Sequence, residues 1–374
     1  MGYGDRKEML GISYLRYCIG ILGEIPNLND LEWESIYDFC CRQAILGVGF
    51  CGIEKLPKEQ KPPYELLLQW IAWILQIENQ NRLLNGRCVK LKEMFAEAGF
   101  STLILKGQGN ALMYPNPLRR QSGDIDIWVR PANRDKKVGV KKTLEYLCSK
   151  CEMSKQVVGY HHVEFPYFDD AEVEVHWRPS WKSSPIHNLR MQRWFIEMAD
   201  RQFSHVDKKT GLHVPTWDFN VVYQLQHMYL HILQEGIGLR QVIDYFYLLK
   251  SANDDEWSKM EDIRQTLKRL DLWHFAGAMM YVLKEVLGME EKYLFVAVDE
   301  KRGTFLCEEI LKSGNFGQYD ERNKELSEKT GIRRSLARLK RQYRFLRDYP
   351  IEVLCAPFQV YHVIWRKLKL WKWE

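Results

Sequence analysis

Hydrophobic residues recur at three- and four-residue spacing through most of the chain, which predicts a largely helical protein. In an amphipathic helix this spacing places the apolar side chains on one face, where they can pack against a neighbouring element. Prolines and glycines interrupt the pattern at intervals and mark the ends of the expected helices. The pattern is clearest at residues 30–46, 64–84, 187–250, 256–313 and 331–347.

Between residues 100 and 180 the period changes from helical spacing to strict alternation, which is typical of β-strands. A helix at 88–98 should lead into the first strand, and a second helix at 135–149 should separate the second strand from the third. The polar stretch at 168–171 predicts a hairpin turn. The expected strands are residues 102–105, 124–130, 161–167 and 172–177.

These patterns together predict an α+β fold, in which a small mixed sheet is flanked by N-terminal and C-terminal helical regions. At 374 residues the chain is long enough for more than one domain. We expect an N-terminal helical region, an α/β core, a helical domain and a basic C-terminal segment. Their expected bounds are 1–95, 96–180, 181–330 and 331–374.

Two carboxylates stand one residue apart on the second expected strand. Asp124 and Asp126 alternate with apolar residues, so both side chains should point to the same face of the sheet. Like charges at this separation repel, and a divalent cation between them removes the repulsion. Mg²⁺ prefers hard oxygen ligands such as carboxylates and phosphates. The pair therefore indicates metal-dependent phosphoryl or nucleotidyl transfer, and removing Asp126 from the metal-free protein should leave the fold intact or more stable.

The flanking motifs are consistent with a phosphate-handling site. The first strand runs into Lys106-Gly107-Gln108-Gly109, where glycine lets the backbone approach a phosphate closely. On the last expected strand, Glu172, Glu174 and His176 share one face. Glu174 is the candidate third carboxylate of a metal site, with Glu172 as the alternative one pleat repeat away.

The ordered set of motifs resembles the uncharacterised nucleotidyltransferase family found in bacteria, within the DNA polymerase β-like nucleotidyltransferase superfamily. The resemblance covers about residues 100 to 250. It rests on Leu105-Lys106-Gly107, Tyr114-Pro115, Arg120, Asp124-Ile125-Asp126 and Glu174-Val175-His176-Trp177. In place of the superfamily's usual Gly-Ser or Gly-Gly pair, this chain has Gly107-Gln108.

The resemblance implies transfer of a nucleoside monophosphate from an NTP to an acceptor that the sequence does not identify. It implies two Mg²⁺ ions, with Mn²⁺ as the alternative, held by three catalytic carboxylates. The catalytic residues and metal ligands would be Asp124, Asp126 and Glu174. The nucleotide-binding residues would be Lys106, Gly107, Gln108, Gly109, Arg120, His176 and Arg240.

Several alternatives stay open at this stage. The altered glycine turn would also suit a catalytically silent scaffold that binds a nucleotide or a partner. Arg240 stands four residues before Asp244, so an intrahelical ion pair competes with a phosphate-binding role. His161 and His162 should lie on opposite faces of their strand, so that at most one of them points at the site. Cys148 and Cys151 have zinc-like spacing, but buried or half-buried thiols are favoured because a second pair is lacking.

Charge and cysteine usage add three expectations. Nine cysteines at irregular spacing indicate a reducing cytoplasm, and the absence of a long apolar run excludes a membrane-spanning helix. The net charge of +5 is uneven, because residues 331–374 hold eleven basic and three acidic residues. This segment, which also carries three tryptophans, could contact an anionic surface such as a lipid or RNA, or could simply pack on the helical domain.

Overall fold

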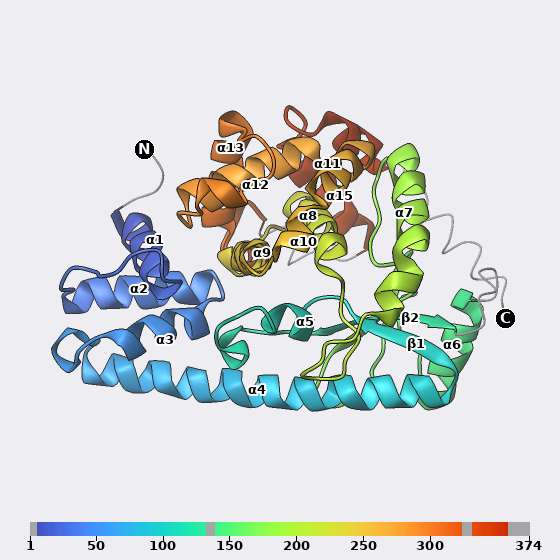
Figure 1. Ribbon diagram of the computed structural model, residues 1–374, viewed down its shortest axis with the longest axis horizontal. Helices are drawn as coiled ribbons and strands as arrows, with labels where there is room; N and C mark the ends of the chain where they lie inside the picture. Colours follow the sequence, from blue (N-terminus) through green and yellow to red (C-terminus); the bar gives the residue numbers. More distant parts are fainter. Residues whose placement is uncertain (1–5, 132–138, 324–330, 358–374) are drawn as a thin grey trace.

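The computed structural model describes residues 6–131, 139–323 and 331–357. A small mixed sheet lies within a mainly helical molecule, as the hydrophobic pattern predicts (Figure 1). The N-terminal helices lie at one end of a long helix, the sheet lies over the other end, and the later helices form a layer above both (Figure 1). The predicted α+β class is therefore confirmed.

Four helices come first, and the last of them is the longest of the described elements. Their bounds are α1 Arg6–Cys18, α2 Asp30–Arg42, α3 Leu46–Lys55 and α4 Tyr64–Glu97. The sequence predicted a break before residue 88, but α4 runs through it without interruption. A single glycine there, Gly86, costs about 1 kcal/mol of helix propensity, which the buried face of α4 outweighs. The helix ends where Gly99 adopts a positive φ of 75°.

The sheet has the strand order β1-β2-β4-β3. β2 and β4 run parallel at its centre, whereas β1 and β3 are antiparallel to their neighbours. The expected hairpin turn at 168–171 lies between β3 and β4. The bounds are β1 Phe100–Ile104, β2 Ile125–Pro131, β3 His162–Glu164 and β4 Val173–His176, with α5 Gln108–Ala111 and α6 Gly139–Lys150 between them.

The two faces of the sheet have different surroundings. Ile125, Ile127 and Val129 on β2 pack with α4 and α6 in a compact apolar core. On the opposite face, Trp128 contacts the aromatic rings of Phe203 and Phe219 in the helical layer. The alternate residues of β2, including Asp126, therefore face the later helices and not α4.

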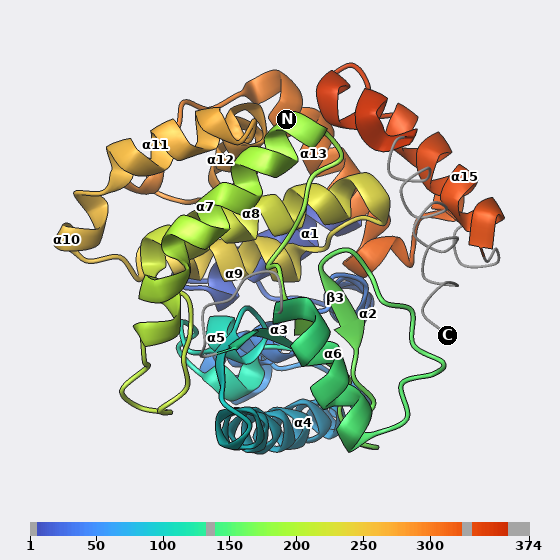
Figure 2. The same cartoon turned by 90° about the vertical axis from the view of Figure 1, so that its right-hand side faces the viewer.

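The remaining helices form the layer over that second face (Figures 1 and 2). Their bounds are α7 Pro185–Ser204, α8 Trp217–Gln234, α9 Leu239–Lys250, α10 Asp254–Trp257, α11 Met260–Arg269, α12 Trp273–Glu285, α13 Glu300–Ser313 and α15 Gly331–Tyr343. Short 3₁₀ turns occur at Lys58–Gln60, Pro117–Arg119, Glu291–Tyr293, Asn315–Gly317 and Glu321–Asn323. One apolar core joins these helices to α1–α4 and does not mark a boundary between them. The predicted division of the chain into four regions therefore stays a prediction. Among the described residues, no helix is long and apolar enough to cross a membrane.

Candidate active site

The parallel pairing of β2 with β4 brings two carboxylates together. The register places Asp126 directly beside Glu174, and His176 follows on the same face of β4. His176 Nε2 lies 3.0 Å from Asp126 Oδ1 and 3.2 Å from Glu174 Oε2. Asp126 and His176 are buried, whereas Glu174 is half-buried at the edge of a cavity. The alternative residue, Glu172, is exposed.

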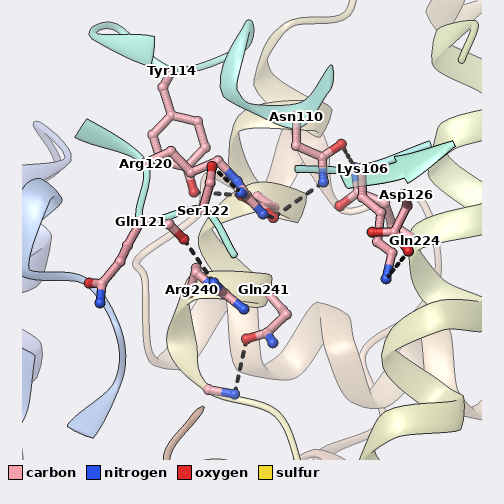
Figure 3. A network of polar contacts seen from close by, with 12 residues as sticks. Lys106, Asn110, Tyr114, Arg120, Gln121, Ser122, Asp126, Gln224, Arg240 and Gln241 are labelled. Atoms are coloured by element: carbon pink, nitrogen blue, oxygen red, sulfur yellow. Dashed lines mark hydrogen bonds and ion pairs between the residues drawn. The ribbon is translucent and has the colours of Figure 1, made fainter. Parts of the chain in front are cut away.

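Lys106 supplies the second positive group beside Asp126. It stands two residues after the end of β1, and its Nζ lies 2.9 Å from Asp126 Oδ1 (Figure 3). Burial lowers the pKa of this ammonium, but the charges of Asp126 and Asp124 outweigh burial and leave the pKa above its usual value. Lys106 therefore carries its charge at neutral pH.

The electrostatic balance of the site follows from these contacts. Burial favours protonation of both carboxyls, but Lys106 and His176 outweigh it, so that the pKa of Asp126 is lowered and that of Glu174 falls to about 2. Burial disfavours the charged imidazole of His176, but its hydrogen bonds with the two carboxylates raise its pKa to about 9. The site thus holds two carboxylates and two cationic side chains.

Asp124 stands at the start of this arrangement. It precedes β2, is half-buried, and lines the same cavity as Lys106 and Glu174. Asp126, Glu174 and His176 offer ligand atoms that all lie within 4.8 Å of one another, and Asp124 is outside this group. Asp124 and Glu174 therefore line one cavity, and His176 joins Glu174 to the buried Asp126.

The glycine turn after Lys106 is a tight backbone feature. Gly107 has φ +57°, and a Cβ at this position would lie 3.2 Å from the carbonyl oxygen of Asp124. The turn can therefore approach the start of β2 only with glycine here. The Gln108 side chain turns away from the cavity and donates to Asn85 Oδ1 at 2.6 Å. A Cβ added at Gly109 would lie 3.1 Å from the carbonyl oxygen of Ile104 and 3.7 Å from the side chain of Val214.

The two candidate arginines lie in another part of the molecule's polar interior. Arg120 forms a bidentate pair with Asp244 of α9, with Nε–Oδ1 and Nη2–Oδ2 distances of 2.8 Å and 2.7 Å (Figure 3). The Tyr114 hydroxyl and the Asn110 amide also donate to this carboxylate. Arg240 donates to the carbonyl of Gln121 at 2.8 Å. The intrahelical pair expected between Arg240 and Asp244 is replaced by this longer-range one, because Arg120 offers two parallel hydrogen bonds.

A cavity of about 1390 Å³ opens beside the carboxylates. It is larger than the roughly 300–1,000 Å³ of ordinary ligand pockets, so it has room for two substrates. The sheet, α7, α8 and α15 contribute to its walls. Five of the ten histidines line it: His161, His162, His176, His227 and His231.

The histidines correct one sequence-based prediction. His161 and His162 both face the cavity, although strand alternation predicted that at most one would. His161 precedes the first residue of β3, so it does not follow the alternation of the strand. Its Nε2 lies 2.7 Å from His162 Nδ1. Burial lowers the pKa of both rings, which favours neutral imidazoles.

Sequence reasoning missed the far wall of the cavity. Tyr160, Trp181, Lys182 and His227 line it, but they come from a loop and from α8, where the local pattern resembles ordinary core packing. Cys148 and Cys151 join no group of ligand atoms within the described residues, and all nine cysteines are free. Cys151 is half-buried as expected, whereas Cys148 is exposed.

The model of a protein family described as "Uncharacterised nucleotidyltransferase" matches residues 29–288, well over half of the chain. The chain belongs to this family. The match confirms the resemblance drawn from the motifs and extends it to the N-terminal helices from α2 onward. No curated protein and no solved structure matches the chain. Membership of the uncharacterised nucleotidyltransferase family supports nucleotidyl transfer in general terms.

Proposed function

We propose that this nucleotidyltransferase-family protein transfers a nucleoside monophosphate from an NTP to an acceptor in a reaction that depends on divalent metal ions. The observation that carries the proposal is the pairing of the buried Asp126 with Glu174, which lines the wall of a cavity. This places hard oxygen ligands from two adjacent strands beside a space large enough for a nucleotide and an acceptor. The acceptor stays open among small molecules, RNA and proteins.

The residues present fit a hard divalent cation. Asp126 Oδ2 is buried and has no hydrogen-bond partner among the described residues, so a carboxylate oxygen is available at the site. Asp126, Glu174 and Asp124 would hold two Mg²⁺ ions, with Mn²⁺ as the alternative. When bound, the ions would neutralise charge on the triphosphate and on the leaving pyrophosphate.

The protein's own groups would orient the substrates. Lys106 places an ammonium at the cavity wall, where it would bind a phosphate oxygen. His176 donates through Nε2 to the two carboxylates and would hold them in position beside the substrate. Low pKa values make Asp126 and Glu174 weak proton acceptors, so their role would be to orient the attacking group and not to deprotonate it. The Gly107 turn would support Lys106, whereas Arg120 and Arg240 would act on the nucleotide only through the fold.

The second candidate is a silent scaffold that binds a nucleotide without transferring it. Gln108 favours it, because its side chain is buried against α4 and the turn offers no hydroxyl to a phosphate. Both candidates predict nucleotide binding, but only the first predicts pyrophosphate release.

The test measures binding and transfer separately. Each NTP is added with Mg²⁺ to the full chain while the melting temperature is recorded, and labelled NTPs are then incubated with a cell extract. A transferase should be stabilised by an NTP and should label an acceptor. Glu174→Gln should lower transfer by about 10²–10³-fold, the loss typical of removing one group that stabilises transition-state charge. Glu172→Gln, its exposed neighbour on the same face, is the matched control and should keep full activity.

Stabilisation without label or pyrophosphate release would support the scaffold. The absence of stabilisation by every NTP would contradict both candidates.

A further inference from the structure

Three imidazoles gather beside the carboxylate pair, and the nucleotidyl-transfer chemistry described above uses only one of them. His161, His162 and His176 offer ring nitrogens that all lie within 4.8 Å of one another. The centroid of the His176 ring lies 5.6 Å from that of His161 and 5.0 Å from that of His162. Among the described residues, neither His161 nor His162 is hydrogen-bonded to Asp126, so this group meets the carboxylate pair only at His176 and beside Glu174.

The backbone holds these three residues firmly in place. His162 pairs with His176 in the antiparallel register of β3 and β4. The carbonyl of His161 accepts hydrogen bonds from the amides of Trp177 and Arg178, which follow β4. Sheet pairing therefore fixes the positions from which all three rings project. Groups held on rigid strands are better suited to bind a small ion than groups on a mobile loop.

The hydrogen bonds of the three rings leave a ring nitrogen that can bind a ligand from the cavity. His161 and His162 are hydrogen-bonded to each other, at 2.7 Å. His176 is 3 % exposed, and its Nδ1 has no hydrogen-bond partner in the described part of the chain. A buried polar atom without a partner indicates a place for a ligand that does not belong to the chain. Glu174 Oε1 lies 3.9 Å from His162 Nε2, so a carboxylate stands beside the three nitrogens.

We propose that His161, His162 and His176 bind a borderline transition-metal ion of the Zn²⁺ type, separate from the hard cation expected at the carboxylates. Imidazole nitrogens suit zinc, cobalt and nickel, whereas Mg²⁺ takes oxygen ligands. Three protein ligands facing a cavity leave a coordination position for water or substrate, as in reactive zinc sites. In the transferase the ion would hold an oxygen of the acceptor beside Glu174. That role rests on the proposed function, but binding of the ion does not.

Cobalt is the probe, because its visible spectrum reports the ligands around it. The full chain, freed of metal with a chelator, is titrated with Co²⁺, and Zn²⁺ is then added as competitor. The wild type should bind one equivalent with the bands of nitrogen and oxygen ligation and without a thiolate charge-transfer band. Zn²⁺ should remove the spectrum.

Variants separate the two ligand groups that share His176. His161→Ala and His162→Ala should each weaken Co²⁺ binding by more than about tenfold, since even outer contacts of a metal site are worth 10–100-fold in affinity. Asp126→Asn, which keeps a side-chain oxygen beside His176, should weaken Co²⁺ binding less than either histidine variant and should keep the same bands. His274→Ala, which removes an exposed histidine on α12, is the matched control and should behave as the wild type. Melting temperatures without metal show whether each variant is folded.

Two results would overturn the proposal. One is a wild-type chain that takes up no Co²⁺, a measurement that needs no variant. The other is loss of the spectrum in Asp126→Asn with retention in His161→Ala, which would assign the ion to the carboxylates. Stabilisation by Mg²⁺ and an NTP is measured on the same protein. Stabilisation by Mg²⁺ and an NTP without a cobalt spectrum would overturn the zinc-type site and leave the proposed transferase function standing. A cobalt spectrum without that stabilisation would overturn the proposed function and leave the zinc-type site standing.

Discussion

At the scale of single residues, the positive charges beside the carboxylates determine whether these carboxylates stabilise or destabilise the fold. The sequence alone shows two aspartates that should repel each other. In the structure, Asp126 is in contact with the ammonium of Lys106 and the imidazole of His176, whereas Asp124 stands apart at the cavity. The repulsion between the aspartates is therefore outweighed by attraction to two cationic groups. This reverses the expectation that removing Asp126 relieves strain.

Asp126→Ala should accordingly destabilise the metal-free protein. The substitution removes the carboxylate in contact with the half-buried Lys106 and leaves His176 with Glu174 alone, and removing one member of a buried ion pair costs about 3–5 kcal/mol. Urea unfolding, with chelator present, measures the free energy of unfolding. Asp124→Ala is the control and should cost much less, because Asp124 is half-buried and lies outside the Asp126–Glu174–His176 group. An Asp126→Ala variant as stable as the wild type would contradict the countercharge account.

His176 should titrate far above an ordinary histidine. In the metal-free protein, NMR should show its pKa near 9, raised from the usual 6.5. Because the folded-state pKa is the higher one, the stabilisation is complete below about pH 6.5 and is lost as the pH rises through about 9. The difference in unfolding free energy between wild type and His176→Phe should shrink over that window. A pKa near 6.5, assigned with the same variant, would contradict the contacts with both carboxylates.

At the scale of elements, one glycine and one ion pair set how the strands meet the helices. The glycine is Gly107, where the chain leaves β1 and passes close to the start of β2. The ion pair is Arg120–Asp244, which joins the segment before β2 to α9. Both features lie outside the cavity, and both determine the position of the segment that carries the aspartates.

Gly107→Ala should destabilise the protein by about 1–2 kcal/mol, the cost of a left-handed conformation for a residue with a Cβ. The added atom would also press on the carbonyl of Asp124. Gly86→Ala is the matched control, because a Cβ on Gly86 meets no atom within 4 Å and α4 is helical there. Alanine should stabilise that position by about 0.5–1 kcal/mol. Thermal unfolding compares the two, and effects of the same sign would refute the account of the turn.

Arg120→Ala should cost about 3–5 kcal/mol, because it leaves the Asp244 carboxylate buried with only neutral donors. Arg120→Lys should not restore stability, since one ammonium cannot form both parallel hydrogen bonds. Arg201→Ala provides the comparison. It removes an equally short bidentate pair with Asp218 on the surface and should cost about 0–1 kcal/mol. Similar losses for the two arginines, measured in urea, would contradict the importance of burial.

At the scale of the whole molecule, the basic C-terminal segment divides into two parts. Within α15 and the turn after it, Arg338 contacts Glu235, and Arg341 and Arg344 lie within 4.0 Å of carboxylate oxygens of Glu309 and Asp320. These charges serve packing inside the protein. Residues 358–374 lie outside the described residues. They include Trp365, Trp371 and Trp373, with four basic residues against one acidic residue.

Any contact with an anionic surface should therefore depend on residues 358–374. A chain ending at Pro357 should keep its melting temperature but lose binding to anionic vesicles or RNA. Wild-type binding should weaken at high salt, because the Debye length falls from about 10 Å at 0.1 M to about 3 Å at 1 M. Charge reversal at Arg341 should instead lower the melting temperature. Equal binding by both chains, or none by either, would remove the recruitment hypothesis and leave only a packing role.

The sequence by itself determined the features that depend on near neighbours. Alternation placed Asp126 on a strand and Glu174 with His176 on another, and the glycine after Lys106 marked a tight turn. Local backbone geometry produces these patterns, so they can be recognised within a few residues. The family resemblance used the same short motifs and was confirmed over a longer stretch of the chain.

Only the tertiary structure decided which of these residues meet. Lys106, Asp126 and His176 come from three separate segments, and Arg120 pairs with Asp244 at a sequence separation of 124 residues. The strand order brings β2 beside β4, and the helical layer closes a cavity over them. Such pairings form because whole faces of the sheet and of the helices are buried against each other. A pattern within a few residues does not specify which faces meet. For that reason the countercharges and the three-histidine group became visible only in the folded chain.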